Sequence, residues 1–416
     1  MTHSLMLSTR LDRPHIPRSG GVVNVLIQLH AASREADRRL PLNLAAVLDR
    51  SGSMAGDKLK YTKEALLFLV DQMAARDRLA AVVYDTRVDT LFASQPVVHK
   101  DPLKAMLRGI DPGGSTNLSG GLATGMQQIA PHAGPGCVSR TLLLTDGLAN
   151  VGVTDPETLV GWVKMWREQG LGLTTIGVGD DFNEDLLVAM AEAGGGSFHY
   201  IANPDQIPAI FAAELEGLLQ VVAQGLQLRL RTAPGAAIET VVGYPPSGTP
   251  QEIALTLPDL YGGETKSLLV RLAVAAPPAD GTIAQLSLSY LPATPGAKLE
   301  TIATPVSLSV TDDAALLAAP PDEEVTRQLG LVEAAAAREE AVRLADQGDL
   351  QGGAQRVAQA ANLFACLAAA GDDYAAEQAA ALRREAELLQ SYHYDQAVRK
   401  QMRQQSHRAR QGRPPR

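Results

Sequence analysis

The sequence predicts a doubly wound, mostly parallel α/β domain, a β-sandwich and a C-terminal α-helical hairpin or bundle. Over residues 41–221 apolar runs alternate with amphipathic stretches, which is typical of strands joined by helices. Over residues 222–312 short alternating runs are separated by turns rich in Pro and Gly, which indicates a β-sandwich. Residues 313–395 are rich in Ala, Glu and Gln, which indicates helices.

The first forty residues contain two expected strands, at residues 4–10 and 22–30, with a Gly-containing turn between them. Two strands alone are only marginally stable in water. We therefore expect residues 1–40 to complete the sandwich of residues 222–312. The α/β domain would then be an insertion in the β domain, with both of its ends at one boundary.

Six strands with helices between them are expected in the α/β domain. The run at residues 42–48 is almost entirely apolar, which is typical of a parallel strand buried on both faces. The stretch at residues 58–73 repeats apolar side chains at helical spacing. The other strands are expected at residues 78–84, 88–92, 140–145, 171–178 and 197–201, and the other helices at residues 118–129, 155–169, 183–193 and 204–219.

The C-terminal part divides into a helical region and a tail. Pro320, Pro321 and Asp322 form a strong helix-start signal, and two Gly-Asp breaks leave about three helices for packing in a hairpin or small bundle. Residues 396–416 contain seven Lys and Arg residues and no acidic residue. We expect this basic tail to be disordered, and we favour solvated disorder over an arm that binds nucleic acid or an acidic partner.

Composition narrows the classes of function. The net charge of −9 argues against general nucleic-acid binding by the folded part. The two cysteines, Cys137 and Cys366, lie far apart, which excludes a disulfide framework and makes a reducing cytosol the simplest compartment. The sequence has neither a signal-peptide pattern nor an apolar run of about 18 residues, so no membrane span is expected. These observations predict a cytoplasmic protein.

The clearest functional signal follows the apolar run at residues 42–48. Asp49, Ser51 and Ser53 alternate in the loop after it, and a glycine between the serines allows this loop to bend tightly. Their side chains offer one carboxylate and two hydroxyls. These hard oxygen donors are the ligands that a small divalent cation such as Mg²⁺ or Mn²⁺ prefers.

Two further loops carry the same kinds of donor. Thr116 lies in a Gly-Gly-Ser-Thr-Asn loop, and Asp146 follows the expected strand at residues 140–145. Ligands of open α/β sheets bind beyond the carboxyl ends of the strands, where strand order reverses. The three loops therefore predict one metal site, although each residue taken alone is typical of a turn or a helix N-cap.

Together the three loops resemble a von Willebrand factor type A domain of the bacterial type, and in particular its metal-ion-dependent adhesion site. All five positions of that site are present: Asp49, Ser51, Ser53, Thr116 and Asp146. The resemblance covers residues 41–221, under half of the chain. It implies that the serines and the threonine bind Mg²⁺ (or Mn²⁺ or Ca²⁺) directly or through water, while the aspartates hold coordinating waters.

The resemblance also implies a function. In this family an Asp or Glu of a partner protein commonly fills the open position of the cation, so we expect a metal-dependent protein–protein interaction module. Bacterial proteins that look like this, with the domain inside a β-sandwich, often work beside AAA+ ATPases or in signalling and stress complexes. The resemblance therefore implies such an association here as well.

An enzyme is the alternative, namely a Mg²⁺-dependent hydrolase or phosphotransferase that uses the same loops. Such a site needs a base or a nucleophile beside the metal. The sequence has neither a phosphate-binding loop that ends in Gly-Lys-Ser/Thr nor a Gly-Xaa-Ser-Xaa-Gly elbow, and its eight histidines form no paired metal motif. We therefore expect a binding module without catalytic residues.

Overall fold

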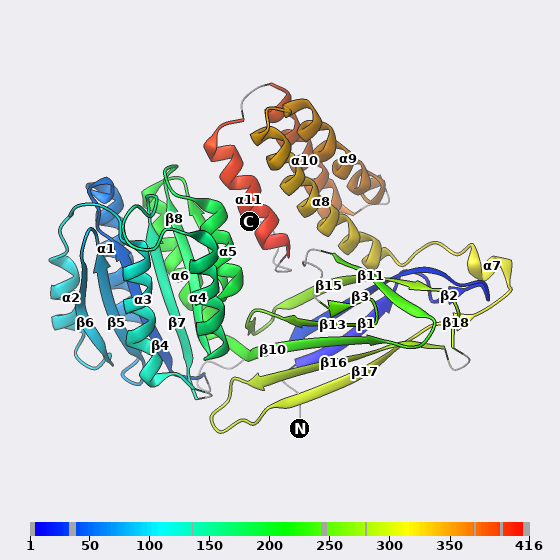
Figure 1. Ribbon diagram of the computed structural model, residues 1–416, viewed down its shortest axis with the longest axis horizontal. Helices are drawn as coiled ribbons and strands as arrows, with labels where there is room; N and C mark the ends of the chain where they lie inside the picture. Colours follow the sequence, from blue (N-terminus) through cyan, green and yellow to red (C-terminus); the bar gives the residue numbers. More distant parts are fainter. Residues whose placement is uncertain are drawn as a thin grey trace.

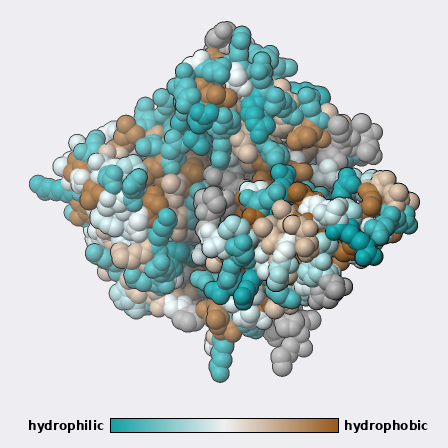
Figure 2. Space-filling model, turned by 45° about the vertical axis from the view of Figure 1, so that its right-hand side comes forward, coloured by the Kyte–Doolittle hydropathy of each residue, from teal (hydrophilic) through white to brown (hydrophobic). Residues whose placement is uncertain are grey.

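Figure 1 shows the computed structural model, which describes residues 5–32, 39–134, 136–242, 248–278, 281–369, 372–391 and 394–410. The α/β domain lies at the left of the view, the β-sandwich at the lower right, and most of the C-terminal helices above the sandwich. Hydrophobic residues are scattered among hydrophilic ones on the face in Figure 2. None of the helices in these ranges combines the length and the apolar character that a membrane span needs.

A six-stranded sheet in the order β6-β5-β4-β7-β8-β9 forms the centre of the α/β domain. Neighbouring strands are parallel, except that β6 is antiparallel to β5. The chain runs outward from β4 to β6 and returns to β7 on the other side of β4, so strand order reverses between β4 and β7. The strands are β4 (Leu42–Asp49), β5 (Arg78–Tyr84), β6 (Val88–Pro96), β7 (Val138–Thr145), β8 (Leu171–Val178) and β9 (Gly195–Ile201).

Helices cover both faces of this sheet, so the predicted doubly wound fold is confirmed. Alternate residues of β4 enter two cores: Leu44 and Leu48 pack in one, Ala45 and Val47 in the other. The first core includes residues of α1 (Asp57–Gln72), α2 (Lys100–Arg108) and α6 (Ile207–Leu219). The second includes residues of α3 (Leu118–Ile129), α4 (Pro156–Glu168) and α5 (Glu184–Ala193).

Helix α2 is not among the elements that the sequence predicts. It has only nine residues, and of these only Leu103 and Leu107 are buried. Two apolar residues one helical turn apart give too short a pattern for a prediction. Its packing against the first core, rather than its own periodicity, therefore accounts for this helix.

Two antiparallel sheets with one shared core form the β-sandwich. One has the order β1-β3-β15-β11, and the other has the order β12-β13-β10-β16-β17, with β14 paired to β10. Their main strands are β1 (Leu5–Leu11), β3 (Gly21–Ala31), β10 (Val221–Thr232), β11 (Ala236–Val242), β13 (Glu252–Thr256), β15 (Thr265–Val274), β16 (Thr282–Pro292) and β17 (Glu300–Ser307). Because β3 pairs with β15, we propose that the α/β domain is an insertion in the sandwich.

The remaining strands and the first C-terminal helix are short. Strand β18 pairs in parallel with β2, and β12 pairs with β13. These elements are β2 (His15–Ile16), β12 (Gly248–Thr249), β14 (Leu260–Tyr261), β18 (Ser309–Val310) and α7 (Ala314–Leu317). Of these elements, β18 and α7 lead the chain into the helical region.

The helical region contains α8 (Glu323–Asp346), α9 (Leu350–Ala369), α10 (Asp373–Gln390) and α11 (Gln396–Arg410). Helix α11 corrects the prediction of a disordered tail for residues 396–410, whereas residues 411–416 lie outside the described ranges. Lys400 is fully buried against α5, where its Nζ lies 2.7 Å from Glu184 Oε2. Arg399 and Arg403 form ion pairs with Asp185. The basic residues thus have acidic partners on the α/β domain, which the local charge pattern alone does not reveal.

Candidate metal centre

The two predicted aspartates lie at neighbouring strand ends, where strand order reverses. Asp49 is the last residue of β4, and Asp146 directly follows the last residue of β7. These strands pair in parallel, with Leu48 opposite Leu144. Both aspartates are 0% exposed. Two apolar strands therefore carry two carboxylates to the same buried edge of the sheet.

Main-chain hydrogen bonds hold the loop after β4 against the loop before α3. Gly52 N donates to Gly114 O at 3.0 Å, and Gly113 N donates to Arg50 O at 2.6 Å. A Cβ atom at Gly113 would lie 1.9 Å from a carboxylate oxygen of Asp85, so this close approach requires glycine. The two loops therefore form one backbone unit that carries the predicted hydroxyl donors.

Asp49 is held by hydrogen bonds. Ser51 N donates to its Oδ1 at 2.8 Å, and Thr145 Oγ1 donates to its Oδ2 at 2.7 Å. Burial raises the pKa of Asp49 and the negative charge of Asp146 adds to this, although the hydrogen bonds from Ser51 and Thr145 act in the opposite direction. A buried carboxylate with a raised pKa favours a nearby positive charge.

Asp146 lies between a serine and a lysine. Ser53 Oγ donates to Asp146 Oδ1 at 2.8 Å, and Lys58 Nζ lies 2.6 Å from Asp146 Oδ2. The hydroxyl oxygens of Ser51 and Ser53 are 3.1 Å apart. Because the Ser53 hydroxyl donates its hydrogen bond to the carboxylate, a lone pair of its oxygen stays available to a cation.

Thr116 completes the group. A Cβ atom at Gly147 would lie 3.5 Å from Thr116 Oγ1 and 3.9 Å from Ser53 Oγ, so both hydroxyls lie beside this glycine. Asn150 fixes the threonine: its Oδ1 accepts from Thr116 N at 2.9 Å, and its main-chain N donates to Thr116 O at 3.2 Å. The structure therefore brings all five predicted residues to one place.

Sequence reasoning does not identify Lys58 and Asn150 as members of this group. Lys58 appears in the sequence only as part of an expected helix start, and Asn150 lies in a loop four residues beyond Asp146. Their roles depend on contacts between loops that are distant in the chain. Spacing along one loop gives no signal for such contacts.

The donor set fits a hard divalent cation. Two buried carboxylates and one ammonium give the centre a formal charge of −1, and the nearby donors are hydroxyl and carboxylate oxygens. In the part of the chain that the structure describes, no group of three or more His, Cys, Asp or Glu residues could hold a metal ion. Any cation at this centre would therefore depend on the hydroxyls of Ser51, Ser53 and Thr116.

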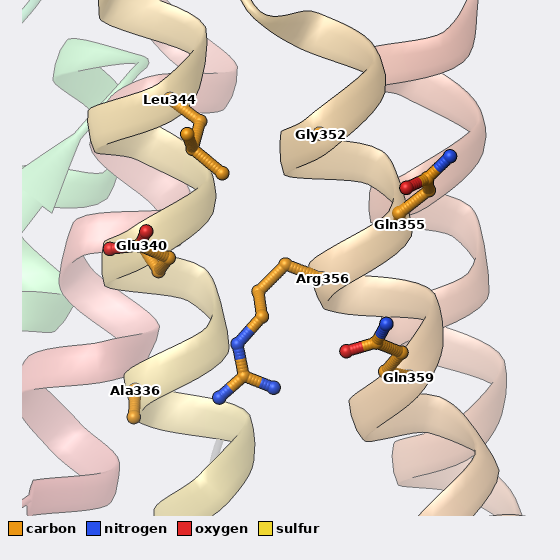
Figure 3. Close-up of a pocket in the computed structure, with 7 residues that line it drawn as sticks. All are labelled: Ala336, Glu340, Leu344, Gly352, Gln355, Arg356 and Gln359. Carbon is orange, nitrogen blue, oxygen red and sulfur yellow. The ribbon is translucent and has the colours of Figure 1, made fainter.

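Two of the surface hollows outside this group lie beside the C-terminal helices. One, of about 450 Å³, lies between α8 and α9, and Figure 3 shows Arg356 of α9 extending into it toward α8. Its lining residues include no histidine, cysteine or hydroxyl side chain: Ala336, Glu340, Leu344, Gly352, Gln355, Arg356 and Gln359. The other, of about 410 Å³, lies beside α11 and is lined by acidic residues such as Asp180 and Asp181. Neither lining pairs a nucleophile with a histidine base.

The α/β domain has known relatives. Residues 43–213 match the family model of the von Willebrand factor type A domain, which confirms the predicted domain in this part of the chain. The chain is 33% identical over 238 residues to the uncharacterized protein sll0103 of Synechocystis sp., a match that covers 57% of this chain and 56% of that protein. It is 32% identical over 223 residues to the uncharacterized protein YfbK of Escherichia coli, covering 52% of this chain and 38% of that protein.

The whole architecture also has a solved counterpart. The structure described as von Willebrand factor type A from Catenulispora acidiphila superposes with a TM-score of 0.72, over 91% of this chain and 90% of that chain, at 18% identity. This likeness shows the fold. The matches to the curated relatives, by contrast, span about half of their length or less.

Proposed function

We propose that the von Willebrand factor type A domain at residues 43–213 is a metal-dependent protein-binding module without catalytic activity. Its cation would be Mg²⁺, or Mn²⁺ or Ca²⁺ in its place, at the centre formed by Asp49, Ser51, Ser53, Thr116 and Asp146. One observation carries the proposal. Two fully buried carboxylates lie at neighbouring strand ends, the ammonium of Lys58 pairs with one of them, and three hydroxyls lie beside them.

Each residue has a distinct task in this proposal. Ser51, Ser53 and Thr116 supply neutral oxygen ligands. Asp49 and Asp146 supply the negative charge and accept hydrogen bonds that orient the groups around them. The bound cation supplies a strong, directional attraction for an anionic oxygen, so an Asp or Glu of a partner protein would complete its ligand set.

The context of this module stays a prediction. Association with an AAA+ ATPase or with a signalling or stress complex, a cytoplasmic location and the absence of nucleic-acid partners follow from the resemblance and the composition alone. Hydroxyl ligands suit a binding role because they hold a cation without supplying a general base. Turnover of a phosphate or ester substrate that depends on both Asp49 and Asp146 would overturn the proposal in favour of a metal-dependent enzyme.

Calorimetric titration of the full chain with Mn²⁺ tests the metal site. Thr116→Ala removes one proposed ligand, and we expect it to weaken Mn²⁺ binding by about tenfold or more. Ser115→Ala is the matched control, because it removes the exposed hydroxyl of the adjacent residue in the same loop. Equal Mn²⁺ affinity for wild type and Thr116→Ala would contradict the assignment.

A further inference from the structure

Lys58 is a charged member of the centre to which the proposed function gives no role. It lies in the first turn of α1, and its Nζ is 2.6 Å from Asp146 Oδ2, whereas Ser53 binds the other oxygen of that carboxylate. The lysine side chain is 24% exposed and Asp146 is fully buried. Lys58 therefore reaches from the surface to the carboxylate.

Gly179, directly after β8, lies beside this lysine. A Cβ atom at Gly179 would lie 3.4 Å from Lys58 Nζ, and the φ angle of Gly179 is +73°, in the region that favours glycine. Lys58 Nζ thus lies close to the loop after β8 as well as to the carboxylate.

Other nearby cations are engaged elsewhere. Arg50, in the loop between Asp49 and Ser51, forms ion pairs with Asp85 and Asp89. Lys60, two residues after Lys58, is exposed and lies over the ring of Tyr61. Lys58, by contrast, forms its ion pair with the buried Asp146.

The formal charge of the centre determines which ligands it binds favourably. Asp49, Asp146 and Lys58 sum to −1, a divalent cation changes this to +1, and a carboxylate ligand brings the sum to zero. Without the lysine charge the same three states carry −2, 0 and −1. Because an uncompensated charge in a buried site is costly, the lysine opposes cation binding and favours an anionic ligand on the bound cation.

We propose that Lys58 is a specificity-determining residue that makes the metal-loaded centre positive and so selects a carboxylate ligand. This inference rests on the proposed function. It predicts two opposite effects from one substitution. Loss of the lysine charge strengthens the binding of the cation and weakens the binding of a carboxylate to the loaded centre.

The test uses the full chain with Lys58→Met and, as a second neutral variant, Lys58→Gln. Calorimetric titration gives the affinity for Mn²⁺, and we expect either variant to bind it about tenfold more tightly or better. The broadening of ¹³C-labelled acetate by the Mn²⁺-loaded protein gives the carboxylate affinity, which we expect to fall by about fivefold or more. Lys58→Arg keeps the charge, and Lys60→Met removes a neighbouring charge. Neither variant should show the tighter Mn²⁺ binding or the weaker acetate binding that we expect of the neutral Lys58 variants.

The outcomes separate this inference from the function on which it rests. Wild-type protein that binds no Mn²⁺ overturns the metal site itself. If wild-type protein binds Mn²⁺ as tightly as the neutral variants, or more tightly, the proposed role of Lys58 is wrong. The metal site itself is then unaffected. Unchanged or tighter acetate binding by Lys58→Met and Lys58→Gln also overturns the role of Lys58.

Discussion

The two ends of β7 carry buried charge in different ways. Arg140, near the start of the strand, and Asp146, directly after its end, are both 0% exposed. Arg140 Nη2 donates to Asp259 Oδ2 at 3.0 Å, and Arg167 Nη2 donates to Asp259 Oδ1 at 2.7 Å. At this end two guanidiniums face two carboxylates, because Glu214 also lies close enough for the charge of Arg140 to lower its pKa.

The opposite end lacks this balance. There Lys58 pairs with Asp146, Asp49 accepts hydrogen bonds from Ser51 and Thr145, and the neighbouring hydroxyls are neutral. Burial of charge is therefore not by itself a sign of function in this molecule. A balanced cluster joins the α/β domain to the sandwich through Asp259, whereas an unbalanced cluster of hard oxygen donors indicates a place for a cation.

The largest expected effect is at the balanced end. Asp259→Ala leaves Arg140 buried without its carboxylate partner, and such a loss costs about 3–5 kcal/mol of unfolding free energy. Urea denaturation of the full chain measures the change, with Glu239→Ala, an exposed carboxylate of β11, as the control. A loss below about 1 kcal/mol would show that this cluster contributes little to stability.

Glu214 gives a pH-dependent test of the same end. Burial alone would raise its pKa, but the hydrogen bond and charge of His199, together with the charge of Arg140, lower it to about 2. A carboxyl with a pKa below its usual 4.5 stabilises the fold above about pH 4.5 and loses this contribution as the pH falls towards 2. Glu214→Gln should therefore cost about 3 kcal/mol at pH 7.

Urea denaturation at pH 7, 4 and 3 measures this difference between wild type and Glu214→Gln. We expect the difference to shrink steadily as the solution becomes more acidic. A difference that stays constant over this range would mean that the ionised form of Glu214 does not stabilise the fold.

At the unbalanced end the expected change has the opposite sign. Asp49→Asn removes one of two close negative charges, and because burial raises the pKa of Asp49, the charged form destabilises the metal-free fold at pH 7. We expect the variant to be more stable than wild type in EDTA. Thermal unfolding in EDTA measures this change, and a large loss of stability would show that the end is balanced after all.

Addition of Mg²⁺ should reverse that order. A ligand that binds only the folded state raises its stability, so wild type should gain stability with increasing Mg²⁺ concentration while Asp49→Asn gains little. Ser115→Ala should gain as much as wild type, because its hydroxyl is exposed and outside the centre. If Mg²⁺ stabilised wild type and Asp49→Asn equally, the end of β7 at Asp146 would not be a cation site that depends on Asp49.

Local patterns predict much of this molecule. The buried strand β4, helix α3 and the five residues of the centre follow from apolar runs and from polar residues placed at strand ends. Each of these patterns extends over only a short stretch of the chain. The rule that parallel strand ends meet at one edge of the sheet then brings the three loops together.

The features that escape prediction all depend on distant partners. Arg140 pairs with Asp259, which lies 119 residues further along the chain, and Lys400 pairs with Glu184 across 216 residues. The basic tail is therefore a helix where the composition predicts disorder. Lys58 and Asn150 escape for the same reason, because each acts on a loop that is remote in sequence.

A Mn²⁺-loaded crystal tests the central claim most directly, because anomalous scattering locates the cation without assumptions about its ligands. We expect one strong peak beside Asp49 and Asp146, at about 2.0–2.3 Å from the hydroxyl oxygens of Ser51, Ser53 and Thr116. A peak at this position would place the cation at the unbalanced end of β7. Fully bound Mn²⁺ at any other position, with no peak at these hydroxyls, would contradict the account.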